Sequence, residues 1–226
     1  MSLADSIRPL VTSVLPESTL QRIRARRRAG AFREAGVAFI HVPRAAGTSV
    51  AEALYGGFIG HFGVRDLIAA APKDVLALPR FAIARNPWDR AVSAWSFARA
   101  GGGTSAGGGV RVARASRYAI AAFDTFESFV TEWLAERDPE RLDGIFRPQV
   151  HYLLDRDGKL ALDHLGRLDR IGETQDWLSD TLGRSITIAH ENASPRSDYR
   201  EYYTPQTRNL VARLYARDIA LLGAEF

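Results

Sequence analysis

The chain of 226 residues is 46% hydrophobic and 25% charged, a composition typical of a soluble protein with one well-packed domain over residues 1–226. It contains no cysteine, which excludes disulfides and thiolate chemistry, and its net charge of +4 favours anionic ligands. No apolar run reaches the length of a membrane span and the N-terminus lacks a signal-peptide pattern, so we expect a cytoplasmic protein.

Residues 1–36 form a basic lead-in to the domain. Six arginines lie close together there, namely Arg22, Arg24, Arg26, Arg27, Arg28 and Arg33. We expect a solvated helix that packs beside the first strand. The alternative is a patch that binds an anionic polymer or makes peripheral contact with membrane lipids.

An apolar strand over Val37–Val42 is followed by a Pro/Gly turn and a helix from about Thr48 to Tyr55. The first turn of a helix has free N–H groups and the positive end of the helix dipole, so this junction is suited to phosphate or sulfate. The turn is not a standard nucleotide-triphosphate loop, because its leading glycine is missing and no lysine precedes Thr48.

A second strand-to-helix junction follows a short helix over Val64–Ala71. The strand Phe81–Ala84 ends at Arg85, and the next helix is predicted over Pro87–Arg99 with Asn86 as its cap. Ser93 lies eight residues after Arg85. An arginine fork at a strand end and a hydroxyl two turns into the helix can hold a phosphate together.

The glycine-rich run at 101–109 predicts a flexible loop over about 100–117, either a plain insertion or a lid over an acceptor site. Asp124 and Glu127 resemble a capping box, which predicts a helix through Glu136.

The C-terminal third continues the alternation of strands and helices. Strands are predicted over Leu168–Ile171 and Ser185–Ala189, and helices over Glu173–Leu182 and from Thr204 to about Leu222. This alternation indicates an α/β fold with a parallel sheet covered by helices. Ligands of such sheets bind beyond the carboxyl ends of the strands, where both anion-binding junctions lie.

Two motifs carry a family resemblance. Phe-Ile-His-Val-Pro-Arg-Ala-Ala-Gly-Thr-Ser at 39–49 resembles the 5′-phosphosulfate loop of the sulfotransferases, and Arg-Asn-Pro-x-x-Arg-x-x-Ser at 85–93 resembles their 3′-phosphate segment. The similarity extends from about Phe39 to Phe226 and is greatest to the carbohydrate-type branch. It implies a P-loop NTPase-like three-layer sandwich, with a central parallel sheet flanked by helices. It also implies transfer of a sulfuryl group from 3′-phosphoadenosine-5′-phosphosulfate (PAPS) to a hydroxyl of a carbohydrate or glycolipid.

The resemblance also implies roles for individual residues. It assigns the 3′-phosphate to Arg85 and Ser93 and the acceptor cleft to Gln149 and His151. The 5′-phosphosulfate would be held by Arg44, Ala46, Gly47, Thr48 and Ser49. The mechanism requires no metal, and the five histidines show no ligand spacing. No nucleic-acid partner is expected.

The transfer needs a base for the acceptor hydroxyl. His61 is our candidate, because relatives place a catalytic histidine in this interval and an imidazole has a suitable pKa, normally about 6.5. The alternative is a histidine that only caps a helix or bonds to the backbone. Glu52 is the second candidate base.

Arg44 departs from the family pattern, which usually has lysine at this position. Arginine stays charged throughout but can still bond to two oxygens, so Arg44 and His61 remain the candidate catalytic residues. Lys73 and Lys159 are the only lysines of the chain, which indicates a general replacement of lysine by arginine.

Two alternatives remain open. One is a pseudoenzyme that binds nucleotide or an anionic glycan without catalysis. The other is a P-loop small-molecule kinase, against which stand the missing GxxxxGK[ST] motif and the lack of an obvious strand-end aspartate for Mg²⁺.

Overall fold

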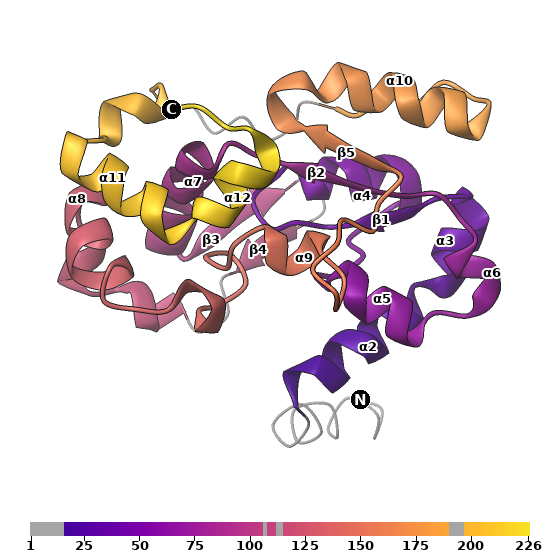
Figure 1. Ribbon diagram of the computed structural model, residues 1–226, viewed down its shortest axis with the longest axis horizontal. Coiled ribbons are helices and arrows are strands. Elements are labelled where there is room, and N and C mark those ends of the chain that lie inside the picture. Colours follow the sequence, from indigo (N-terminus) through magenta and orange to yellow (C-terminus); the bar gives the residue numbers. More distant parts are fainter. Residues whose placement is uncertain (1–15, 106–107, 112–114, 190–196) are drawn as a thin grey trace.

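The computed structural model describes residues 16–105, 108–111, 115–189 and 197–226 (Figure 1). It is a mixed α/β fold built around a small parallel sheet. The strands β1 (Ala38–Ile40), β2 (Arg80–Ala84) and β5 (His164–Arg167) pair in the order β1-β2-β5, so β2 is central. Phe39 lies opposite Phe81, which in turn lies opposite His164.

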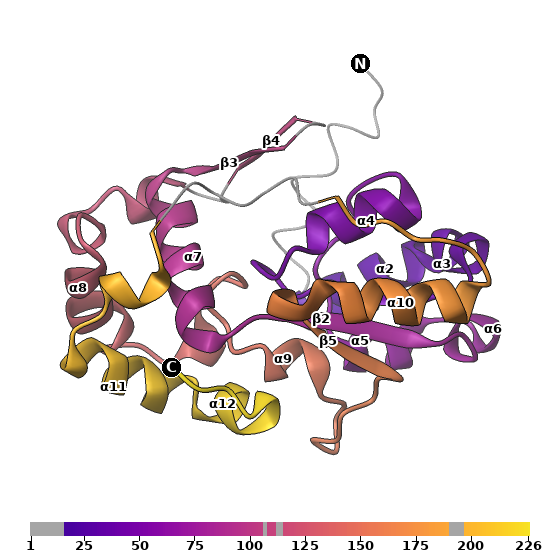
Figure 2. The same ribbon diagram turned by 90° about the horizontal axis from the view of Figure 1, so that it is seen from above.

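Helices flank this sheet, and together they enclose one hydrophobic cluster, which we call the sheet core. β1 is fully buried, and the rings of Phe39 and Phe81 stack with centroids 4.8 Å apart. α10 packs along β5, and α2 packs on α5 (Figures 1 and 2). The surrounding helices are α2 (Glu17–Arg27), α3 (Ala29–Ala35), α4 (Gly47–Tyr55), α5 (Val64–Ala70), α6 (Lys73–Leu76), α9 (Val150–Leu153) and α10 (Ile171–Leu182).

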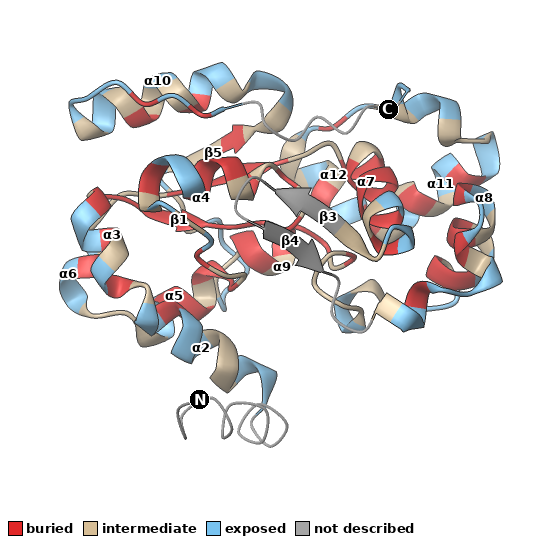
Figure 3. Cartoon of the chain, turned by 180° about the vertical axis from the view of Figure 1, so that it is seen from behind, coloured by how far each residue is buried: buried red, intermediate tan, exposed pale blue. Residues whose placement is uncertain are grey.

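A second cluster, the helical core, lies at the other end of the molecule from α3 and α6 (Figure 1). It consists largely of aromatic rings such as those of Phe123 and Trp133, whose centroids are 5.0 Å apart. α7 (Pro87–Arg99) starts at the end of β2 and buries its residues here, as Figure 3 shows. The other helices are α8 (Phe126–Ser128), α11 (Pro205–Leu214) and α12 (Ala216–Leu222).

The glycine-rich segment forms two antiparallel strands, β3 (Gly102–Ser105) and β4 (Gly108–Arg111), where the sequence predicted no regular structure over 100–117. Glycine weakens a strand through its conformational entropy, but it keeps the N–H and C=O groups that form a ladder. Ala115–Tyr118 forms a 3₁₀ turn, and residues 106–107 and 112–114 lie outside the described residues.

The predicted helices α4, α5, α7 and α10 are confirmed to within two residues. The helix expected from Asp124 instead begins after Thr125, whose hydroxyl accepts from the Ser128 N–H, and it continues as a π-helical turn over Phe129–Leu134. The last helix breaks at Tyr215 into α11 and α12.

Two strand predictions are wrong. The third strand is His164–Arg167, and Leu168–Arg170 forms a 3₁₀ turn. Residues 185–189 form no strand, and two of their N–H groups bond to side chains of α10: Ile186 N–H donates to Ser179 Oγ at 3.0 Å, and Ile188 N–H donates to Gln175 Oε1 at 2.7 Å. Within the described ranges, no helix has the length and apolar character that a membrane span needs.

Candidate functional site

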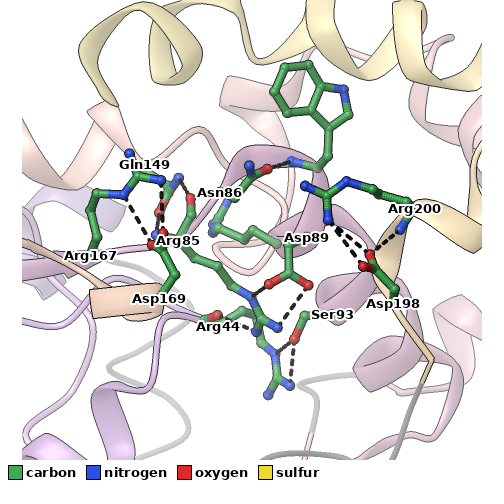
Figure 4. Close-up of polar contacts among 12 residues, drawn as sticks. Arg44, Arg85, Asn86, Asp89, Ser93, Gln149, Arg167, Asp169, Asp198 and Arg200 are labelled. Carbon is green, nitrogen blue, oxygen red and sulfur yellow. Dashed lines mark hydrogen bonds and ion pairs between the residues drawn. The ribbon is translucent and has the colours of Figure 1, made fainter. Parts of the chain in front are cut away.

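The two strand-to-helix junctions meet at the carboxyl ends of β1 and β2. Arg44 follows β1, and its Nε and Nη2 atoms lie 3.2 and 3.0 Å from Ser93 Oγ on α7 (Figure 4). Arg85 follows β2, and its Nη1 donates to the Arg44 carbonyl at 3.2 Å. The structure therefore brings Arg44, Arg85 and Ser93 together, although they lie up to 49 residues apart in the chain.

The loop before α4 has an unusual backbone conformation. Arg44 and Ala46 both have positive φ, at 69° and 57°, which costs a non-glycine residue about 1 kcal/mol or more. Ala46 is the N-cap of α4 and offers no side-chain hydrogen bond to the first turn, which contains Gly47, Thr48 and Ser49. The N–H groups of this turn have no partner within the helix, so they are available to an anion.

Gly47 is required by a close approach of His41. A Cβ atom on Gly47 would lie 1.8 Å from His41 Cδ2 and 2.0 Å from Nε2. The His41 ring is 3% exposed and stacks on Phe39. Burial, followed by the charges of His61 and Arg44, holds the pKa of His41 well below its usual range, so the ring is neutral. His41 thus fixes the start of α4.

Arg90, which sequence reasoning missed, holds the same loop from the other side. Its side chain is buried in α7, and Nε donates to the Pro43 carbonyl at 3.0 Å and Nη2 to the Ile145 carbonyl at 3.3 Å. Its position in the Arg-Asn-Pro-x-x-Arg frame was the available signal. One face of α7 therefore supplies both Ser93 and the anchor of the Arg44 loop.

Arg85 is oriented by two neighbours. Its guanidinium forms a forked ion pair with Asp89, with Nε–Oδ2 at 2.7 Å and Nη2–Oδ1 at 3.1 Å. Gln149, predicted to line the acceptor cleft, is instead fully buried against the Arg85 main chain. Its Oε1 accepts from the Arg85 N–H at 2.9 Å, and its Nε2 donates to the Arg85 carbonyl at 2.7 Å. Gln149 thereby fixes the end of β2.

A pocket of about 510 Å³ adjoins this arrangement. Its volume is within the range of small-molecule sites. It lies beyond the ends of β2 and β5, with Tyr199 and residues near the C-terminus forming its other side. Its charged lining residues are Arg85, Asp89, Arg167, Asp169, Arg170, Arg200 and Glu225, an excess of one positive charge. No motif in the sequence indicated Arg170 or Arg200 as a site residue.

His61 lies beside His41, with ring centroids 4.2 Å apart, and its Nδ1 is 3.2 Å from the His41 carbonyl oxygen. Because a carbonyl can only accept, Nδ1 carries the proton and Nε2 keeps its lone pair. Burial lowers the pKa of His61 to about 4, with smaller contributions from the charges of Arg24, Arg90 and Arg44. The ring is therefore neutral near pH 7, the form that a base requires.

The other candidates lie elsewhere. Glu52 is exposed on α4. His151 Nδ1 lies 3.0 Å from Glu140 Oε2, and Arg65 Nη2 lies 2.9 Å from His151 Nε2. Burial and the Arg65 charge lower the pKa of His151. Over the described part of the chain, no group of three or more histidine, aspartate and glutamate side chains is arranged to hold a metal ion.

We compared the chain with models of protein families, with curated proteins and with solved structures. None of the three comparisons finds a match.

Proposed function

We propose that the protein is a sulfotransferase that moves the sulfuryl group of PAPS to a hydroxyl of a carbohydrate or glycolipid. The observation that carries the proposal is the convergence of Arg44, Arg85 and Ser93 at the ends of two adjacent parallel strands. Such a convergence provides two cationic forks, a hydroxyl and a helix N-terminus within one region, which matches a ligand with two separate anionic groups.

In this proposal the first turn of α4 and Arg44 bind the 5′-phosphosulfate, and Arg85 and Ser93 bind the 3′-phosphate. The nucleoside occupies the neighbouring pocket, which Arg85 borders. A phosphate that enters takes over bonds that Ser93 and Asp89 now make to the two arginines. A phosphate oxygen is a stronger acceptor for a guanidinium than a neutral hydroxyl is, so the exchange at Ser93 is favourable.

The chemistry is an in-line substitution at sulfur. The acceptor oxygen forms a new S–O bond while the bond from sulfur to the 5′-phosphate oxygen breaks, and 3′-phosphoadenosine-5′-phosphate leaves. His61 Nε2 takes the hydroxyl proton. Arg44 stabilises the negative charge that develops on the departing oxygen.

The direct test is a binding titration with 3′-phosphoadenosine-5′-phosphate, followed by an acceptor screen with labelled PAPS. At one hundred times its Kd the nucleotide should stabilise the fold by about 2.7 kcal/mol. His61→Ala should abolish transfer and leave nucleotide binding nearly intact, whereas Glu52→Gln should retain activity. A larger stabilisation by ATP–Mg²⁺ would favour the kinase alternative.

A non-catalytic nucleotide-binding or glycan-binding role is the second candidate. It is favoured by the engagement of Arg44, whose guanidinium contacts Ser93 and lies 4.3 Å over the ring of Phe97. It is also favoured by the low basicity of His61. This candidate predicts nucleotide binding without turnover in the wild-type protein and in Arg44→Lys.

A further inference from the structure

Phe58 is an unusually exposed aromatic residue. Its side chain is 50% exposed, and it lies in the short segment between α4 and α5. Gly56 and Gly60, on either side, have positive φ of 65° and 93°, which L side chains rarely adopt. The glycines let the chain turn sharply around Phe58, and half of the residue stays exposed.

The Phe58 ring lies against the proposed base. Its centroid is 5.1 Å from that of His61 and 5.5 Å from that of His41, in edge-to-face geometry in both cases. An exposed aromatic ring beside a base is a suitable surface for a sugar, because the C–H groups on one face of a pyranose pack against an aromatic ring. Such a contact would hold the sugar hydroxyls next to His61.

The cationic side chain of Arg28, directly after α2, contacts the same segment. Arg28 Nε donates to the carbonyl of Ile59, the residue after Phe58, at 3.0 Å. Arg24 precedes Arg28 by four residues, so both lie on one face of the helical segment, and Arg24 is exposed. The Arg24 charge also contributes to the lowered pKa of His61, in agreement with this proximity.

The position of α2 is fixed at its other end too. Arg147 forms a forked ion pair with Glu17, with Nη1–Oε1 at 2.6 Å and Nη2–Oε2 at 2.8 Å. Glu17, Gln21, Arg24 and Arg28 follow the helical repeat i, i+4, i+7 and i+11, so Arg24 shares a stripe with the two anchored residues Glu17 and Arg28, whereas Ala25 is the residue of α2 that is buried. Arg24 therefore lies one helical turn from Arg28, which contacts the Phe58 segment.

We infer that Phe58, Arg24 and Arg28 form an acceptor subsite for an anionic saccharide, a sugar chain that carries carboxylate or sulfate groups. The ring of one sugar packs on Phe58 beside His61, and an anionic group of the same chain pairs with Arg24. The role as acceptor subsite rests on the proposed transfer. The binding of the saccharide itself does not, so the two can fail separately.

The test uses neutral dextran and carboxymethyl dextran of equal length, with the full-length protein. Phe58→Ala should raise the KM or Kd for both polymers about tenfold and leave nucleotide affinity unchanged, whereas Phe58→Trp should restore binding. Arg24→Ala should weaken the binding of carboxymethyl dextran severalfold and leave the binding of neutral dextran unchanged. Leu160→Ala and Arg156→Ala, which alter an exposed apolar and an exposed cationic residue elsewhere, serve as matched controls.

The outcomes separate the alternatives. If wild-type protein transfers sulfate but Phe58→Ala and Arg24→Ala match their controls, the subsite is wrong and the proposed function stands. If the wild type transfers sulfate to no acceptor, yet Phe58→Ala and Arg24→Ala both weaken the binding of carboxymethyl dextran, the subsite is supported and the proposed reaction is not. If phosphatidylserine vesicles bind and carboxymethyl dextran does not, the surface docks on lipid and the inference is overturned.

Discussion

At the scale of single residues, close contacts around the Arg44 loop limit which side chains the site tolerates. The His41 ring occupies the space that a side chain at Gly47 would need, and the Arg90 guanidinium holds the loop at the Pro43 carbonyl. The sequence indicated the importance of Gly47, because a Pro/Gly turn before a helix is recognisable. It gave no indication of His41 as the obstacle, since the two residues meet only after folding.

We predict that Gly47→Ala destabilises the protein by about 1–3 kcal/mol, the usual cost of overpacking, because the added methyl group would lie 1.8 Å from His41 Cδ2. Urea denaturation measures this change. Gly30→Ala is the matched control: no atom of the described residues lies within 4 Å of its added Cβ, and alanine favours the helix, so that variant should be at least as stable as wild type. His41→Ala should relieve the Gly47→Ala penalty. Equal stability of Gly47→Ala and wild type would contradict the close approach.

The half-buried His61 also makes stability depend on pH. Its pKa is about 4 in the folded protein and near 6.5 when unfolded, so the unfolded chain binds more protons between these values. The contribution of His61 to the free energy of unfolding should therefore be complete above pH 6.5 and should be lost as the pH falls to 4. His61→Gln has no titrating group there and should lose less stability than wild type over this range. Parallel pH profiles for the two proteins would show that His61 is not protected from protonation.

At the scale of elements, local signals predicted α4 and α7 and failed where tertiary contacts decide. Asn86 and Pro87 predict the start of α7, and the Asn86 side chain accepts from the Trp88 N–H as expected. β5 was misplaced because its residues are less apolar than the following turn; pairing with β2 determines its position. The contact of Gln149 with the Arg85 main chain was not predicted for a similar reason, since Arg85 lies 64 residues away.

We predict that Gln149→Leu destabilises the protein by several kcal/mol, because it leaves the Arg85 N–H and C=O without their buried partner, at about 1–3 kcal/mol each. It should also weaken nucleotide binding, since the end of β2 carries the Arg85 fork. Urea denaturation and titration with 3′-phosphoadenosine-5′-phosphate measure the two effects. Gln206→Leu, on the exposed side of α11, should change neither. A Gln149→Leu variant with wild-type stability would show that water replaces the amide.

At the scale of the whole molecule, the candidate site lies where the sheet core and the helical core adjoin. β2 ends in one core and α7 continues into the other, and the 510 Å³ pocket is lined from both. The sequence predicted a parallel sheet and the two junctions at its edge. It did not predict the division into two cores or the contribution of Gly223 and Glu225 to the pocket, because both depend on contacts between distant segments.

We predict that 3′-phosphoadenosine-5′-phosphate protects amides in both parts of the molecule. Hydrogen–deuterium exchange should slow in the first turn of α4 and in residues 197–203, since both border the proposed nucleotide position. α6, at the far end of the molecule, is the internal control and should not respond (Figure 2). Protection confined to one of the two segments would place the nucleotide elsewhere.

The groups that already bond to the guanidiniums of Arg85 and Arg44 determine which anions can bind between the two junctions. Arg85 is paired with the Asp89 carboxylate, and Arg44 bonds to the Ser93 hydroxyl. A chloride ion offers one charge and no directed lone pairs, so it gains nothing by replacing them. The proposed nucleotide instead offers two anionic groups, each with several oxygens, one for the guanidinium of Arg44 and one for that of Arg85. Monovalent salt would thus leave the junction empty, and multiply charged esters would be selected by their charge.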